Sequence, residues 1–114
     1  MPEDIPPSAR ATAVNQPVVL ENFAFWSKDC EARPFSVVLN SGPANGTFET
    51  RDSTKPIPER AGIGSVPAKC VGIEVASKEL VYTPANGFAG SDQIVVEVGN
   101  QSGRKSFRYV ISVQ

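Results

Sequence analysis

The feature that most constrains the fold is the recurrence of apolar residues at every second position in two segments near the end of the chain. In DQIVVEV, residues 92–98, and in KSFRYVISV, residues 105–113, every second residue is apolar and so lies on one face of an extended backbone. The turn-forming sequence GNQSG separates the two segments. A period of two residues is typical of strands that bury one face, so both segments are predicted to be β-strands.

The rest of the chain favours short extended elements joined by turns. Its 114 residues include ten prolines and nine glycines, which interrupt regular structure frequently. Segments 17–26, 34–40, 46–50, 71–76 and 79–83 are expected to be strands, with a hairpin between 34–40 and 46–50 and a turn at Ser77 and Lys78. No segment has a convincing helical period. We therefore predict an all-β fold, an immunoglobulin-like two-sheet sandwich of about seven strands.

The length of the chain leaves room for one domain. Residues 1–16 are rich in Pro, Ala, Ser and Thr and show no period, so we expect a flexible N-terminal segment there. Residues 17–114 then form the β-sandwich domain. Residues 51–69 show no alternation and are expected to form a long loop, which in a compact domain is usually functional or tied down.

The two cysteines, Cys30 and Cys70, indicate the compartment. They are too few for a zinc site, and the chain has no histidine to supply further ligands. In a small, loop-rich β domain, two cysteines fit one disulfide and therefore an oxidising environment. The alternative is a pair of buried, reduced thiols in a cytosolic protein.

A family resemblance rests on GPANGTFET and, later, ELVYTPANGFAGSDQIVVEV. These segments resemble the bacterial cadherin-like and Ig-like repeats, whose pattern is P-x-x-G-T, a strand ending in Y-x-P, then G-F-x-G-x-D and an aromatic-rich strand. The resemblance covers roughly the second half of the chain, and residues 35–50 less fully. It implies a fold, and a bacterial setting, rather than a particular activity. The matching positions are Pro43, Gly46, Thr47, Tyr82, Pro84, Gly87, Phe88, Gly90 and Asp92.

The GFAGSD segment is interpreted as a structural turn. Pro84 is expected to end a strand, because it lacks a backbone donor. Gly87 and Gly90 permit backbone angles that a side chain would penalise. Phe88 between them is expected to plug the end of the core, and Asp92 to accept hydrogen bonds from loop amides.

Composition argues against several functions. A net charge of −1 provides no general attraction to nucleic acid, and no apolar run is long enough for a membrane span. Without histidine the commonest general base is absent, so we expect no enzyme activity, no catalytic residues and no cofactor. The acidic residues Asp29, Glu31 and Asp92 are either part of a calcium site or surface acids and a capping Asp. No D-x-D run supports it, and no metal site is predicted.

The long loop supplies the candidate partner-binding residues, which are Ile57, Arg60, Ile63 and Val66. If its apolar residues are exposed, they make a contact patch for another protein, whereas if they fold back the loop covers a sheet edge.

A second candidate is the aromatic group Phe23, Phe25 and Trp26. It is either core packing beside the disulfide or a platform for a ligand.

These patterns lead to one main hypothesis and two alternatives. We expect a non-enzymatic, exported Ig-like module, monomeric as an isolated domain, that binds a protein partner or has a structural role in the periplasm or at the cell surface. The first alternative is a carbohydrate-binding module, which requires Trp26 and its neighbours to be coplanar and exposed. The second is an enzyme inhibitor that presents its long loop, with Arg60 as an anchor.

Overall fold

The two alternating segments form an antiparallel hairpin at the centre of the larger sheet. In the computed structural model, which describes residues 7–59, 66–101 and 103–114, β6 (Gly90–Asn100) pairs with β7 (Gly103–Val113) along its whole length. Ile94 lies opposite Tyr109, and both side chains are fully buried. The prediction of two strands with one buried face is confirmed.

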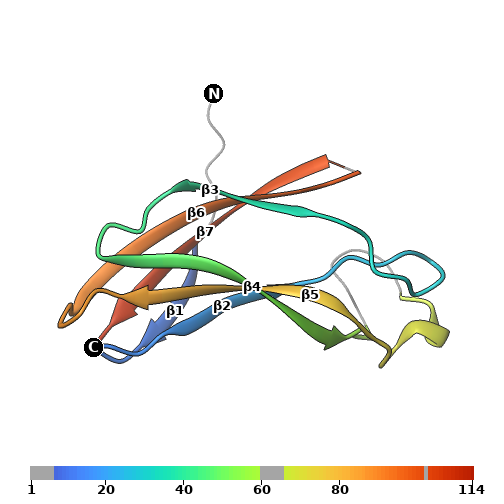
Figure 1. Cartoon of the computed structure of the whole chain (residues 1–114), viewed down its shortest axis with the longest axis horizontal. Helices are drawn as coiled ribbons and strands as arrows, with labels where there is room; N and C mark the ends of the chain where they lie inside the picture. The colour runs from blue at the N-terminus through green and yellow to red at the C-terminus, as the bar shows by residue number, and fades with distance from the viewer. Residues whose placement is uncertain (1–6, 60–65, 102) are drawn as a thin grey trace.

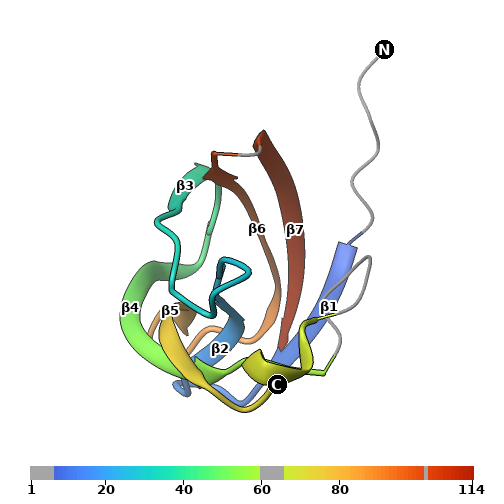
Figure 2. The same cartoon turned by 90° about the vertical axis from the view of Figure 1, so that its right-hand side faces the viewer.

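Seven strands in two sheets make up the fold, as predicted (Figure 1). The four-stranded sheet has the order β1-β7-β6-β3, and the three-stranded sheet has the order β2-β5-β4. The sheets pack face to face, so the chain is an all-β sandwich; Figure 2 shows the two layers from one end. The remaining elements are β1 (Pro7–Thr12), β2 (Val18–Phe23), β3 (Ser36–Ser41), β4 (Gly46–Pro56), β5 (Glu74–Pro84) and the short 3-10 helix η1 (Ala68–Cys70).

Strand β1 corrects the interpretation of residues 1–16 as a flexible segment. Pro7–Thr12 pairs with β7 in parallel, and the amide of Val14 donates to the carbonyl of Gln114 at 3.1 Å. Residues 1–6 lie outside the described residues. The sandwich therefore extends at least to residue 7, because backbone pairing with β7 does not require the apolar alternation that the sequence lacks here.

The expected hairpin between β3 and β4 is wrong. β3 pairs with β6 in one sheet, and β4 pairs with β5 in the other, so the chain crosses between sheets at residues 42–45. The chain is interrupted between the two strands, as expected, but a turn signal does not say which strands pair across it.

Strand β5 replaces two expected strands. Residues 74–84 form one continuous strand through Ser77 and Lys78, where a turn was expected. β4 likewise continues to Pro56, so residues 51–56, expected as loop, pair with residues 74–79 of β5. The loop between the two strands comprises residues 57–73.

Two clusters of apolar side chains hold the structure together. The larger fills the space between the sheets, where burial of apolar area is the main stabilising contribution. A smaller cluster joins Ile57, Cys70 and Val75 under the 57–73 loop. The larger cluster consists of Leu20, Leu80, Tyr82, Ile94, Val96, Val98, Tyr109, Ile111 and Val113.

Candidate functional site

The predicted structural turn is built around Asp92. Its carboxylate oxygen Oδ1 accepts hydrogen bonds from the amides of Ala44 (2.9 Å) and Gln93 (2.8 Å). Its Oδ2 accepts from the amide of Asn45 and from the hydroxyl of Tyr82, both at 2.9 Å. Burial alone raises the pKa of Asp92, but these four donors outweigh it and hold the pKa below its usual value. The expectation that Asp92 accepts hydrogen bonds from loop amides is confirmed.

The motif residues from distant parts of the chain meet at this carboxylate. The hydroxyl of Tyr82 also lies 3.2 Å from the carbonyl of Asn45. A Cβ atom on Gly46 would come within 2.7 Å of the Tyr82 ring, so glycine permits the close approach. β5 ends at Pro84, Gly87 has a φ of +78°, and Phe88 packs against the main core. All of this is scaffold, because every polar group of Asp92 is used within the fold.

The predicted disulfide between Cys30 and Cys70 is present. The two Cα atoms are 5.2 Å apart, within the normal range for a disulfide. The bridge joins the 24–35 segment to the 57–73 loop. Ile57 pairs its amide with the carbonyl of Ile73, and its carbonyl with the amide of Gly72, each at 2.9 Å. The long loop is thus tied down at both ends.

The loop residues expected to bind a partner are in part buried. Ile57 is 1% exposed and belongs to the smaller core cluster, so at this position the alternative in which the loop folds back on the sheet holds. Val66 is half-buried against the same cluster. Arg60 and Ile63 lie outside the described residues. For Ile57 and Val66 the loop folds back on the sheet, since apolar side chains gain more from burial than from solvent contact.

The aromatic residues do not form a shared platform. Phe23 contacts Phe107 with ring centroids 5.0 Å apart, and Phe25 contacts Phe35 at 4.9 Å, in both cases tilted and against the main core. Trp26 packs instead against the cluster around the disulfide. Phe25 and Trp26 are adjacent in the sequence, but they therefore pack against two different apolar clusters.

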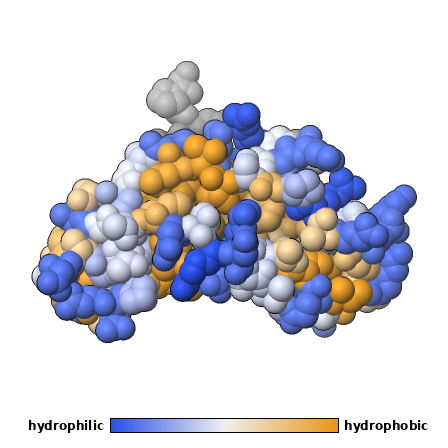
Figure 3. Space-filling model, in the orientation of Figure 1, coloured by the Kyte–Doolittle hydropathy of each residue, from blue (hydrophilic) through white to orange (hydrophobic). Residues whose placement is uncertain are grey.

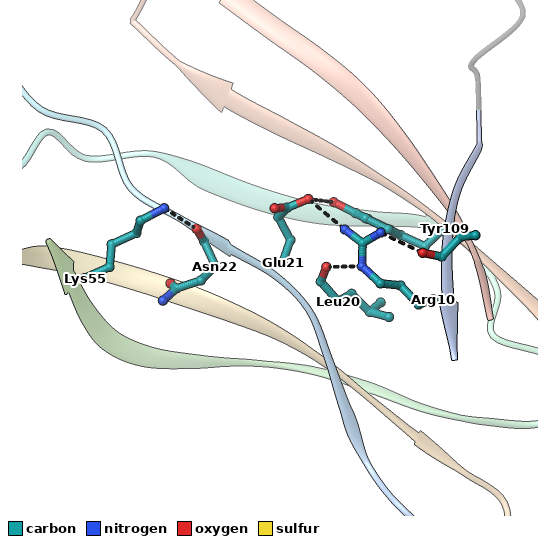
Figure 4. A network of polar contacts seen from close by, with 7 residues as sticks. Arg10, Leu20, Glu21, Asn22, Lys55 and Tyr109 are labelled. Carbon is teal, nitrogen blue, oxygen red and sulfur yellow. Dashed lines mark hydrogen bonds and ion pairs between the residues drawn. The ribbon is translucent and has the colours of Figure 1, made fainter. Parts of the chain in front are cut away.

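A polar network links β1 and β2 at one edge of the sandwich (Figure 4). Arg10 donates from Nε to the carbonyl of Leu20 at 2.7 Å and from Nη2 to Glu21 Oε1 at 3.3 Å. The Tyr109 hydroxyl donates to the same Glu21 oxygen at 3.2 Å. Burial, and then the charge of Glu21, raise the pKa of Tyr109 above its usual value. In the smaller sheet, Lys55 donates to the carbonyl of Asn22 at 3.2 Å.

The network joins the two sheets. The Arg10 guanidinium also lies over the Tyr109 ring, 5.3 Å from its centroid, so the cation is held by hydrogen bonds, charge and the aromatic face together. These contacts of Arg10 explain why β1 stays on the sandwich, although the other side chains of β1 are small.

A hollow of the surface lies at the end of the sandwich that carries the disulfide, the end that faces the viewer in Figure 2. Pairing of β2 with β5 stops at Phe23 and Lys78, so residues 74–77 of β5 extend beyond their β2 partner. This leaves a cleft of about 500 Å³, lined by Ala32, Arg33, Pro34, Phe35, Asp52, Ala76, Ser77 and Lys78.

The cleft combines an apolar lining with charged groups. Alanine, proline and phenylalanine side chains supply the apolar part. Lys78 Nζ lies 3.3 Å from Asp52 Oδ1, and the Asp52 side chain is 92% exposed. Arg33 donates to Gln101 Oε1 at 3.0 Å. A second hollow of about 310 Å³ shares Arg33 and Pro34 with the first, so both open beside the same short segment.

No pattern in the sequence indicates this cleft. Its residues come from three separate parts of the chain, and none belongs to a motif. A local signal could not have found them, because the pairing of β2 with β5 and the course of residues 32–35 bring them together.

Within the described residues, no three His, Cys, Asp or Glu side chains gather where they could hold a metal ion. Across the same residues, no helix is long and apolar enough to span a bilayer. The chain matches no known family model and no curated protein.

Proposed function

We propose that this protein is a non-enzymatic, exported β-sandwich module of Ig-like type that binds another protein, in the periplasm or at the surface of a bacterium. The observation that carries the proposal is the open cleft between residues 32–35 and strands β4 and β5. Apolar walls with a few charged groups are typical of surfaces that recognise a partner.

The chemistry of the cleft defines what fits it. An apolar side chain of the partner would be covered by Pro34, Phe35 and Ala76. Polar groups beside that side chain would meet Arg33, Lys78 and Asp52. Such a combination suits an extended protein segment, in which side chains of alternating character lie within a few ångströms of each other.

The disulfide supports an extracytoplasmic location. Disulfides persist in oxidising compartments and are rare in the cytosol. The bridge is formed just before the cleft-lining residues 32–35 in the sequence. Formation of the disulfide therefore also restrains the position of the proposed binding residues.

The alternatives receive less support. A carbohydrate platform needs coplanar, exposed aromatic rings, whereas Phe23 and Phe25 pack on the main core and Trp26 on the second cluster. An inhibitory loop would use Arg60, which lies outside the described residues. We therefore retain protein binding as the proposal.

The test uses a photo-crosslinking amino acid at Arg33 and, as a control, at Ser91, an exposed position in β6 outside the cleft lining. Bacterial envelope extracts are irradiated with each oxidised protein, and cross-linked proteins are identified by mass spectrometry. We expect a partner cross-linked from position 33 alone. Equal labelling from both positions would contradict the proposal.

Affinity measurements with the purified partner then test the cleft itself. Ala76→Arg fills the cleft at an exposed position and is expected to weaken binding at least about tenfold, as the loss of one well-packed contact does. Ser91→Arg is the matched control and leaves affinity unchanged. If Ala76→Arg binds like the wild type, the cleft is not the binding site.

A further inference from the structure

The sandwich has four edge strands, and they differ in charge. Strands β1 and β3 flank the larger sheet, and β2 and β4 flank the smaller one. β1 carries Arg10 and β2 carries Glu21. β4 carries Glu49, Arg51, Asp52 and Lys55. All six residues of β3, SVVLNS, are described, and none of them is charged. Charges on an edge strand prevent it from pairing with another chain, and β3 lacks this protection.

Strand β3 also exposes aliphatic side chains. Val38 is 50% exposed and Leu39 is 41% exposed. Figure 3 shows a broad apolar area on this side of the molecule, over the region where β3 runs in Figure 1. Strand order places β6 on one side of β3 and no described strand on the other, so a row of backbone groups faces outward.

We infer that β3 of one chain pairs antiparallel with β3 of a second copy about a two-fold axis. In such a contact the same surface must complement itself, so each residue meets the partner residue at the symmetry-related position. With Val38 on the axis, it lies against the partner's Val38. Val37 then lies against the partner's Leu39, and Ser36 against the partner's Asn40.

In this register, apolar residues face apolar residues and polar residues face polar residues. The pairing Leu39 with Val96 and Val37 with Val98 places Val37 and Leu39 on the face toward the core, and Val38 on the outer face. The contact between chains therefore extends the apolar core layer across the axis. Serine and asparagine meet each other at its ends, and no charged side chain of β3 loses its hydration.

The structure also limits the strength of this contact. The register between β3 and β6 shifts between Leu39 and Ser41, which marks a bulge at Asn40. Regular pairing thus covers about five residues, and we expect a weak dimer that forms as concentration rises. The inferred dimer differs from the monomer expected from the sequence and joins the two larger sheets into one. The inference does not rest on the proposed function.

Sedimentation velocity of the oxidised protein, from low micromolar to millimolar concentration, tests the inference. We expect the mean mass of the wild type to rise from one chain toward two. Val38→Lys and Val38→Glu each place like charges on the two-fold axis and are expected to remain monomeric throughout. Val19→Lys, at a residue 41% exposed on edge strand β2, is the matched control and should associate like the wild type.

Mixing the two charged variants tests the register. An equimolar mixture of Val38→Lys and Val38→Glu is expected to regain association, because lysine then faces glutamate across the axis. Near-ultraviolet circular dichroism checks that both variants are folded. A wild type that stays monomeric at every concentration overturns the inference, and so does dimerisation unaffected by the charge at position 38. A mixture that fails to associate overturns the pairing centred on Val38.

Discussion

The hydroxyl of Tyr82 donates to the carboxylate of Asp92 at 2.9 Å, and this contact ties the two sheets together inside the core. Tyr82 belongs to β5 of the smaller sheet, and Asp92 to β6 of the larger one. The same carboxylate binds the amides of the crossing segment at Ala44 and Asn45. One charged group therefore satisfies the backbone where the chain passes from one sheet to the other, and hydrogen bonds to a buried charge are stronger than neutral ones.

Asp92→Asn is expected to destabilise the protein by about 3 kcal/mol, because the amide nitrogen would face backbone donors and leave at least one of them without an acceptor. Urea unfolding at neutral pH measures the change. Asp52→Asn is the matched control, since that carboxylate is 92% exposed, and is expected to cost less than about 0.5 kcal/mol. Equal effects of the two variants would refute the role assigned to Asp92.

The stability of the fold is expected to depend on acid through Asp92. Its pKa in the folded protein is lowered from the usual 3.8, so the charged carboxylate contributes stability that is fully present above the unfolded value. That contribution is lost as the pH falls below about 4 and through the folded pKa. The difference in unfolding free energy between wild type and Asp92→Asn should therefore shrink in acid. A difference that stays constant with pH would show that the charge of Asp92 is not responsible.

Reduction of the Cys30–Cys70 disulfide is expected to lower the free energy of unfolding by about 4 kcal/mol, because the bridge closes a loop of 40 residues in the unfolded chain. Urea unfolding with and without reductant measures the effect. The Cys30→Ala/Cys70→Ala double variant serves as the control and should not respond to reductant. Alkylation of both thiols in the unreduced, denatured protein would show that no disulfide forms.

The contact between Tyr109 and Glu21 is expected to couple the two sheets. A double-mutant cycle with Tyr109→Phe and Glu21→Gln should give an interaction energy of about 1 kcal/mol, since the shared hydrogen bond is partly buried and charged. The exposed pair Arg104 and Glu97, with Nη1 and Oε1 3.3 Å apart, provides the comparison. Its cycle should give about zero. Similar values for both pairs would contradict the proposed link.

How far the strands could be predicted depended on their side-chain pattern. β6 and β7 were clear because one face of each carries a run of apolar residues at every second position, from Ile94 to Val98 and from Phe107 to Val113. β1 was missed because its core-facing positions, Ser8, Arg10 and Thr12, are polar, and β7 supplies the backbone partner that makes it a strand. At Ser77 and Lys78, two adjacent polar residues were interpreted as a turn although β4 pairs with both.

The candidate sites also differ in how far they could be predicted from the sequence. The disulfide and the role of Asp92 followed from residue type and spacing. The sequence left open whether Ile57 is exposed, because its burial depends on Cys70 and Val75, which lie 13 and 18 residues further along the chain. The cleft residues Arg33 and Lys78 carried no sequence signal.

The sequence by itself indicated an all-β protein, favoured a disulfide between its two cysteines and predicted a structural turn at GFAGSD. Each of these depends on local chemistry, such as a period of two residues, a pair of thiols, or glycines beside a hydrogen-bonding carboxylate. The tertiary structure alone decided which strands pair, where the cleft opens and which edge strand lacks charge. Those properties depend on contacts between residues far apart in the chain, because a backbone hydrogen-bonding edge accepts any strand, and packing of the two sheets selects among the possible partners.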